Sequence, residues 1–243
     1  LIAGQRGLLR VGMGNTWAYL GGGVVLGLHW LAFFASIKLS NVSVAVAGLS
    51  AAAVFTALVE PWVTGRKHSV VEFVIGGLVV AGLGVAFRFG GSYTMGLVVA
   101  LVSALLAAIF PSLNKRFVDQ GGSPAAITFY EVLGASGTCL LVAMFRGGLQ
   151  IPTTSDLLWL SVLALFCTVL AFWIGVRLLR TMSAYTVALA LGFEPVYGML
   201  LAAVFFAEHE QISAGFYLGS AVIVLANIAY PVLRRRQAKV HTT

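Results

Sequence analysis

The sequence predicts an all-α integral membrane protein, a polytopic helical bundle built from two inverted repeats. Two observations lead to this prediction. The chain of 243 residues is 60% hydrophobic and only 9% charged, a balance that a water-soluble core of this size does not require. In addition, a long apolar part of the chain recurs later in the sequence with the same order of spans and loops.

Eight apolar stretches have the length of membrane spans, because a helix needs about 20 apolar residues to cross roughly 30 Å of hydrocarbon. Their apolar runs are continuous rather than alternating, which favours helices over a β-barrel. The turns between them are short and carry most of the charge. The predicted spans are Asn15–Ile37, Val42–Val63, Val70–Phe87, Thr94–Leu113, Pro124–Phe145, Asp156–Leu178, Ala184–Phe206 and Ser213–Val232.

The internal repeat relates Trp30–Phe87 to Phe172–Ala229 at a constant offset of 142 residues without a gap. Each copy contains the end of one span, a basic residue with a short loop, a second span, a polar turn and a third span with glycine. Five spans separate each helix from its mate, and because five is odd the copies face opposite sides of the bilayer. Inverted repeats are typical of secondary transporters. The aligned pairs include Lys38 with Arg180, Val54 with Val196, Phe55 with Tyr197 and Gly77 with Gly219.

The repeat also predicts the domain organisation. The second repeat, residues 93–243, contains five helices and a basic tail, whereas the first, residues 1–92, contains only three. We therefore expect a ten-helix parent of which eight helices are present here, the first two being missing. The two copies are expected to superimpose, over Asn15–Val63 and Asp156–Phe206, after a two-fold rotation about an axis in the membrane plane.

The distribution of lysine and arginine predicts the orientation. Twelve basic residues fall on one side and only Lys38, Arg88 and Arg146 on the other. The excess places both ends of this chain in the cytoplasm of a multi-pass cell-membrane protein. The net charge of +7 then needs no nucleic acid as a partner, and the run Arg234–Arg236 is interpreted as an anchor to anionic lipid headgroups. The twelve are Arg6, Arg10, Arg66, Lys67, Lys115, Arg116, Arg177, Arg180, Arg234, Arg235, Arg236 and Lys239.

Glu194 is the sharpest functional candidate, since it lies at the centre of the predicted span Ala184–Phe206 and is followed by Pro195. Proline removes a backbone donor and kinks a helix. A carboxylate beside a helix break at mid-membrane is the arrangement expected of a substrate or proton site. Glu194 is therefore the proton-coupling candidate, the alternative being a protonated glutamic acid that only packs.

Two further groups could contribute to a binding site. Glu131 could pair with Glu194 or with a basic residue, or its carboxyl could instead reach the membrane interface. His29 shares a broad helix face with Trp30, Phe33 and Phe34 and could bind an amphipathic solute or a proton, although a packing role is the alternative. We predict a mid-membrane cavity lined by His29, Trp30, Phe33, Tyr130, Glu131, Trp173, Glu194 and Tyr197, which suits an organic solute.

Other polar residues are assigned plainer roles. Glu60 and Glu72 lie near Arg66 and Lys67 in sequence, which favours ion pairing at the inner face, with gating as the alternative. Neither Cys139 nor Cys167 belongs to a CxxC or Cys/His pattern, so no metal or cofactor is predicted. The absence of a phosphate-binding Gly-Lys loop argues against an ATP-driven pump on this chain. Interhelical hydrogen bonds are expected from Ser50, Ser103, Thr168 and Asn227.

Several motifs are spread along the whole chain, namely His29–Phe34, Lys38–Val44, Phe55–Pro61, Phe129–Glu131 and Glu194–Gly198, followed by Ala207-Glu208 and a helix with Gly219. Together these motifs resemble the EamA family of the drug/metabolite transporter superfamily. The resemblance implies ten helices in two inverted repeats, cytoplasmic termini and the movement of small metabolites, often outward. It does not name a substrate.

Three functions compete on this basis. The favoured one is a secondary transporter of small organic metabolites or drugs, acting as an exporter by alternating access, with protons as a candidate coupling ion. A membrane-embedded enzyme would use Glu131, Glu194 and His29 as its acid–base set, but these groups are single and lie on different predicted helices, so no enzyme is expected. A non-transporting membrane subunit would leave Glu194 without a purpose.

Overall fold

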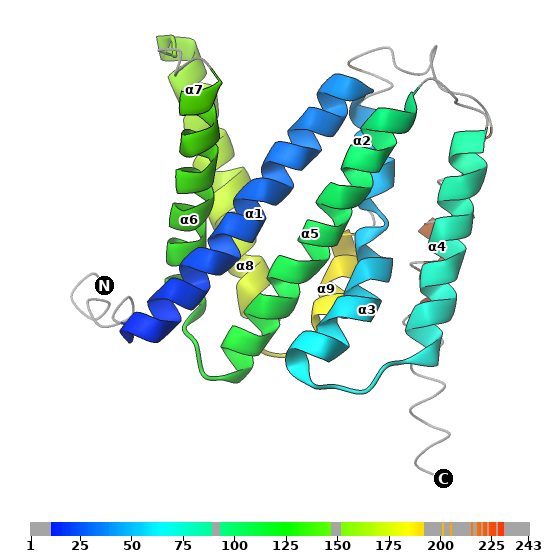
Figure 1. Cartoon of the computed structure of the whole chain (residues 1–243), viewed down its shortest axis with the longest axis horizontal. Helices are drawn as coiled ribbons and strands as arrows, with labels where there is room; N and C mark the ends of the chain where they lie inside the picture. Colours follow the sequence, from blue (N-terminus) through cyan, green and yellow to red (C-terminus); the bar gives the residue numbers. More distant parts are fainter. Residues whose placement is uncertain are drawn as a thin grey trace. The chain divides into compact units, whose positions relative to one another are not determined.

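The computed structural model describes residues 11–88, 93–146 and 152–191, together with some residues between 201 and 230. Every regular element in these parts is a helix, which confirms the all-α prediction (Figure 1). Among the described residues, five apolar segments are long enough to cross a membrane. They are Met13–Leu39, Val42–Thr64, Thr94–Asp119, Pro124–Phe145 and Thr154–Leu178.

The helix bounds follow the predicted spans closely where the chain is described. The predicted span Pro124–Phe145 is helix α6, and Val70–Phe87 is matched by α4, Val70–Arg88. Helix α5, Thr94–Asp119, continues six residues past the predicted end at Leu113, so the helical backbone extends beyond the apolar run. Helix α1 covers Met13–Leu39, and α9 is described over Ala184–Leu191.

Two predicted spans are less regular than the sequence indicated. The span from Val42 consists of α2, Val42–Leu49, and α3, Ala52–Thr64. At the break between them the Ser50 hydroxyl donates to the Ala47 carbonyl at 2.5 Å, so a side chain competes for a backbone acceptor. The span Thr154–Leu178 contains α7, Thr154–Val162, a π-helical segment, Leu163–Leu170, and α8, Ala171–Leu178.

The chain divides into two compact units, which are described separately. Unit 1 contains Leu1–Leu28 and Phe110–Ser183, and unit 2 contains His29–Ile109 and Ala184–Thr243. Helices α1 and α5 each contribute to both. Each unit combines segments from both predicted repeats, 1–92 and 93–243, so the repeat boundaries and the two-fold relation stay predictions.

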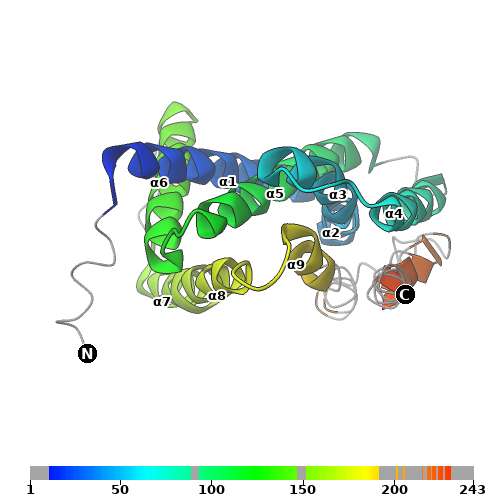
Figure 2. The same cartoon turned by 90° about the horizontal axis from the view of Figure 1, so that it is seen from below.

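In unit 1, α1 packs on α6 through residues that have little or no side chain. A Cβ added to Gly27 would lie 2.8 Å from Thr138 Cβ and 2.9 Å from the Ala135 carbonyl oxygen, and one added to Gly23 would collide with the Glu131 carbonyl oxygen. Gly23 and Gly27 are four residues apart and so form a small-xxx-small pair, which lets two membrane helices approach closely. Helix α8 lies against α6 within the same unit (Figure 2).

The turn between α5 and α6 fixes the register of that hairpin. Gly121 has φ +85°, and its N–H donates to the Val118 carbonyl at 3.0 Å, while the Gly122 N–H donates to Phe117 at 2.9 Å. This pair of bonds is the Schellman motif, which satisfies the last carbonyls of a helix. The next helix begins at Pro124, whose fixed φ and missing N–H suit a first helical position.

In unit 2, α3 packs against both α4 and α9 (Figure 2). The hydrophobic core of this unit includes two tyrosines, Tyr185 and Tyr230, whose rings meet edge-on with centroids 4.5 Å apart. Helix α3 ends at Gly65, which has φ +74° and donates its N–H to Pro61. The left-handed conformation at Gly65 redirects the chain into the loop that carries Arg66.

We predict that Gly23→Ala lowers the thermal stability of the purified protein, whereas Gly21→Ala does not. An added methyl at position 23 would collide with the backbone of Glu131, which cannot move aside as a side chain could, while the same methyl at Gly21 meets nothing within 4 Å. Overpacking of this kind costs about 1–3 kcal/mol. Melting curves of the two variants in one detergent test the prediction, and equal curves would contradict it.

Candidate functional site

A buried ion cluster in unit 2 joins segments that are far apart in sequence. Arg66 Nη2 lies 3.0 Å from Glu60 Oε2 and 2.6 Å from Glu72 Oε2. Glu60 and Glu72 are each 1% exposed. Tyr230 donates its hydroxyl to Glu72 Oε1 at 2.9 Å. The prediction that Glu60 and Glu72 form ion pairs is therefore confirmed.

Glu60 also holds the beginning of α9. Its Oε1 accepts the Ala184 N–H at 2.8 Å and its Oε2 accepts the Tyr185 N–H at 2.9 Å. The first N–H groups of a helix have no partner inside the helix and carry a partial positive charge. A carboxylate from α3 therefore caps α9, and the helix end helps to balance the second negative charge of the cluster.

Arg66 is the cation of this cluster. Burial lowers the pKa of Arg66, but the hydrogen bond that Arg66 donates to Glu72 and the charges of Glu60 and Glu72 outweigh burial, and the pKa is raised above its ordinary value. The guanidinium is thus a permanent cation. Removing one partner from a buried ion pair of this kind would leave an uncompensated charge in an apolar surrounding, which is strongly destabilising.

Glu131 in unit 1 has a very different environment. Its side chain is completely buried, and its Oε2 accepts a hydrogen bond from Asn114 Nδ2 at 2.9 Å. Its Oε1 has no hydrogen-bond partner in the described part of the chain. The expected pairing of Glu131 with a basic residue is wrong within that part of the chain. The alternative that its carboxyl reaches the interface is also wrong, because α1 covers the carboxyl at Gly22.

His29 bonds across helices in unit 2. Its Nδ1 lies 3.0 Å from the Ser103 carbonyl oxygen and 2.9 Å from Ser103 Oγ, which in turn donates to the His29 carbonyl at 3.2 Å. The expected interhelical role of Ser103 is confirmed. Ser50 and Thr168 instead bond to carbonyls of their own segments, Ala47 and Leu163, so that expectation is wrong for both.

The residues of the predicted cavity are distributed over both units. His29, Trp30 and Phe33 belong to unit 2, while Tyr130, Glu131 and Trp173 belong to unit 1. Trp30, Phe33, Tyr130 and Trp173 are half-buried, and the Arg177 guanidinium lies over the Trp173 ring at 5.4 Å. Glu194 and Tyr197, like Asn227, lie outside the described residues.

Sequence reasoning missed two partners. Asn114 comes seven residues before Gly121 and Glu131 ten residues after it, so the α5–α6 hairpin brings the two side chains together. The two glycines of the turn were the sequence signal from which this hairpin could have been predicted. Tyr230 is 158 residues from Glu72, and nothing in the sequence links them. The Glu60 cap of α9 was missed for the same reason, since Glu60 and Ala184 are 124 residues apart.

These features define a multi-pass helical membrane protein with buried carboxylates. Residues 94–229, more than half of the chain, match the model of a protein family described as "EamA-like transporter family". The chain therefore belongs to the EamA-like transporter family, as the sequence motifs indicated.

The fold recurs in a solved structure described only as "Crystal structure of protein". It is similar with a TM-score of 0.69 and 18% identity over 97% of this chain and 82% of that chain. At this identity the likeness concerns the fold alone. No curated protein matches this chain.

We predict that Glu60→Gln lowers thermal stability more than Asp119→Asn, although both replace a carboxylate by an amide. An amide at position 60 would direct N–H groups towards the N–H groups of α9, and an unsatisfied buried donor costs about 1–3 kcal/mol. Asp119 is half-exposed and pairs with Lys115 one turn away, and exposed pairs contribute about 0–1 kcal/mol. Melting temperatures of both variants test this prediction. A larger loss of thermal stability for Asp119→Asn than for Glu60→Gln would refute the role of Glu60 as the cap of α9.

Proposed function

We propose that this protein is a secondary transporter of small organic metabolites or drugs in the cell membrane, and that it works as an exporter by alternating access. The observation that carries the proposal is its membership of a transporter family. Buried carboxylates in apolar helices support it, since ionisable groups at membrane depth usually mark a substrate or ion pathway. No bound cofactor enters the proposal.

The proposed solute site is the cavity predicted from the sequence, without Glu131, whose carboxyl group is fully buried beneath α1. It would be formed by aromatic side chains with few polar groups, a composition that suits an amphipathic organic solute. Trp30, Phe33, Tyr130 and Trp173 are each half-buried, which supports their inclusion in the proposed lining. Glu194 and Tyr197 complete the proposed lining.

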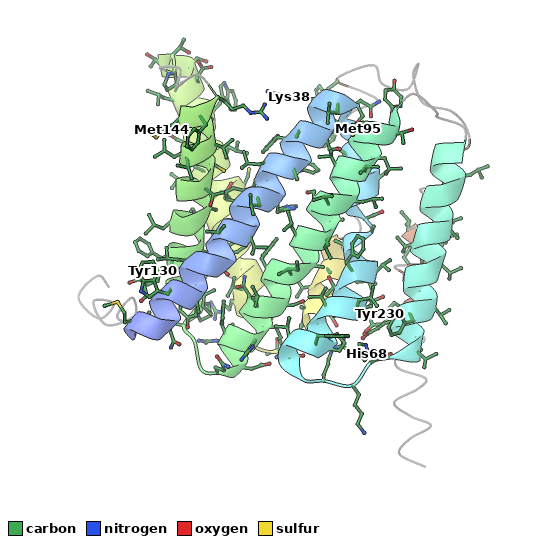
Figure 3. The ribbon with its side chains drawn as sticks, viewed as in Figure 1. Lys38, His68, Met95, Tyr130, Met144 and Tyr230 are labelled. Carbon is green, nitrogen blue, oxygen red and sulfur yellow. The ribbon has the colours of Figure 1, made fainter. Side chains whose placement is uncertain are left out.

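The proposed orientation has both ends of the chain in the cytoplasm. Within unit 2, Lys38 and Met95 lie at one end and His68 and Tyr230 at the other (Figure 3). The basic loop with Arg66 therefore lies at the end opposite Lys38. Tyr230, close to the end of the last predicted span, bonds to Glu72 beside that loop, which supports a common side for Arg66 and the basic tail. Anionic lipid headgroups would be the partner of that tail.

The experiment that tests the function begins with a thermal-shift screen of metabolites on the purified protein. A solute that stabilises the protein is then loaded into proteoliposomes, and its counterflow against the labelled solute is measured. Saturable counterflow is the expected result. Chemical conversion of the solute without transport would point instead to an enzyme, and neither transport nor conversion of any stabilising solute would contradict the proposal.

We predict that Phe33→Ala raises the KM of counterflow about tenfold, equivalent to about 1.4 kcal/mol of lost binding, whereas Phe34→Ala leaves it unchanged. The two are adjacent aromatic residues on α1, but Phe33 is half-buried and Phe34 is 58% exposed. Michaelis–Menten curves for the two variants, at equal protein incorporation, provide the measurement. A larger effect at Phe34 would exclude the proposed lining.

Glu194 is the proposed coupling residue. We predict that Glu194→Gln abolishes transport driven by a pH gradient while the protein stays folded, because the amide keeps the size of the side chain but cannot release a proton. Transport is measured under an imposed gradient, with monodispersity in gel filtration as the control for folding. Normal gradient-driven transport by the variant would make Glu194 structural.

A further inference from the structure

The carboxyl group of Glu131 is enclosed between three helices of unit 1. It projects from α6, receives its hydrogen bond from Asn114 on α5 and lies beneath Gly22 and Gly23 of α1. The side chain is 0% exposed. Oε1 of Glu131 and Oδ1 of Asn114 are both buried without a hydrogen-bond partner in the described part of the chain. Two unsatisfied oxygens in one enclosure are unusual, since buried polar atoms normally find partners.

The space beside Oε1 limits what can bind there. A Cβ added to Gly22 would collide with Oε1, and one added to Gly23 would collide with the Glu131 backbone. The α1 backbone is therefore in direct contact with the carboxyl group and leaves no room for a methyl group on that side. A solute atom or a hydrated cation is at least as large as a methyl group, whereas a proton requires no additional space.

The surrounding charges do not favour the ionised form. The titratable group from α1 near Glu131 is the buried phenol of Tyr19. The partner from α5 is the neutral amide of Asn114, and Lys115 further along α5 pairs with Asp119. On α8, which packs against α6, the charged group is the exposed Arg177 over Trp173. Burying a carboxylate anion with one hydrogen bond in such a place costs far more free energy than burying its protonated form.

We propose that Glu131 is a proton-binding site whose protonation closes the contact between α1 and α6. The carboxylate binds one proton to become a neutral carboxyl group, and no other bond changes. The neutral group fits the closed arrangement seen here beneath Gly22. The ionised group requires water or a cation, which can reach it only if α1 moves away from α6, so protonation and helix separation are linked equilibria. The relevance of this site to transport rests on the proposed function, but proton binding itself does not.

The test uses pH-difference infrared spectra of the full chain in lipid vesicles. The wild-type protein should show a protonated-carboxyl band that disappears as the pH is raised. Glu131→Gln should lose this band, and the matched control Asp119→Asn should keep it, since that carboxyl is half-exposed and paired. Asn114→Leu should shift the band, because the hydrogen bond to the carboxyl is lost. Monodispersity in gel filtration establishes that each variant is folded.

Several outcomes would overturn the proposal. One is a band that persists in Glu131→Gln, or that is lost in Glu194→Gln instead. Another is the absence of any pH-dependent carboxyl band, which would mean that Glu131 never changes its protonation state. Loss of the band on adding sodium at constant pH would assign a metal cation to the site in place of a proton.

A transport measurement separates this inference from the proposed function. With a solute found in the screen, Glu131→Gln should lose the pH dependence of counterflow while Asp119→Asn retains it. If the protein transports and Glu131→Gln keeps the full pH dependence, the link between this proton site and transport is refuted, and proton binding itself is decided by the infrared band. If no solute is transported but the band titrates as expected, the proposed function fails and the proton site stands.

Discussion

The structure depends on one constraint, which is that an apolar surrounding cannot satisfy polar groups. Helices meet this constraint for the backbone because their N–H and C=O groups bond internally. Helix ends do not, and in unit 2 the carboxylate of Glu60 supplies the missing partner for the start of α9. The same carboxylate pairs with Arg66, which also binds Glu72. One side chain from α3 thus connects a helix terminus, a loop and a second helix.

Three fully buried glutamates show how surroundings assign different roles to one residue type. Glu60 and Glu72 share a cation and receive further N–H or O–H donors, so their negative charge is compensated where they lie. Glu131 receives a single bond from a neutral amide. A compensated carboxylate stabilises a fixed arrangement of helices, whereas an uncompensated one is sensitive to proton uptake. Burial alone would not have distinguished them.

The sequence predicted those features that arise from local patterns. The bounds of α6 and α4 follow from continuous apolar runs, and the ion pairs of Glu60 and Glu72 follow from the short loop that brings Arg66 close to both. The break at Ser50 and the π-helical segment Leu163–Leu170 were not predictable, because they replace one set of backbone bonds by another within an equally apolar stretch. Tyr230 and the α9 cap depend on tertiary contacts over more than a hundred residues.

Glycine at the α1–α6 contact and the carboxyl group beneath it form one physical arrangement. Without a side chain at Gly22 and Gly23, α1 lies close enough to seal Glu131 from its surroundings, and the seal is what makes ionisation costly. A larger residue there would hold the helices apart and admit water. Water would solvate the ionised form of Glu131 and so remove the extra free-energy cost of ionisation that the close contact causes. Close packing of small residues, usually regarded as a source of stability in membrane helices, here also determines the chemistry of a neighbouring group. The sequence shows the glycines and the glutamate separately, and only the register of α1 against α6 brings them into one site.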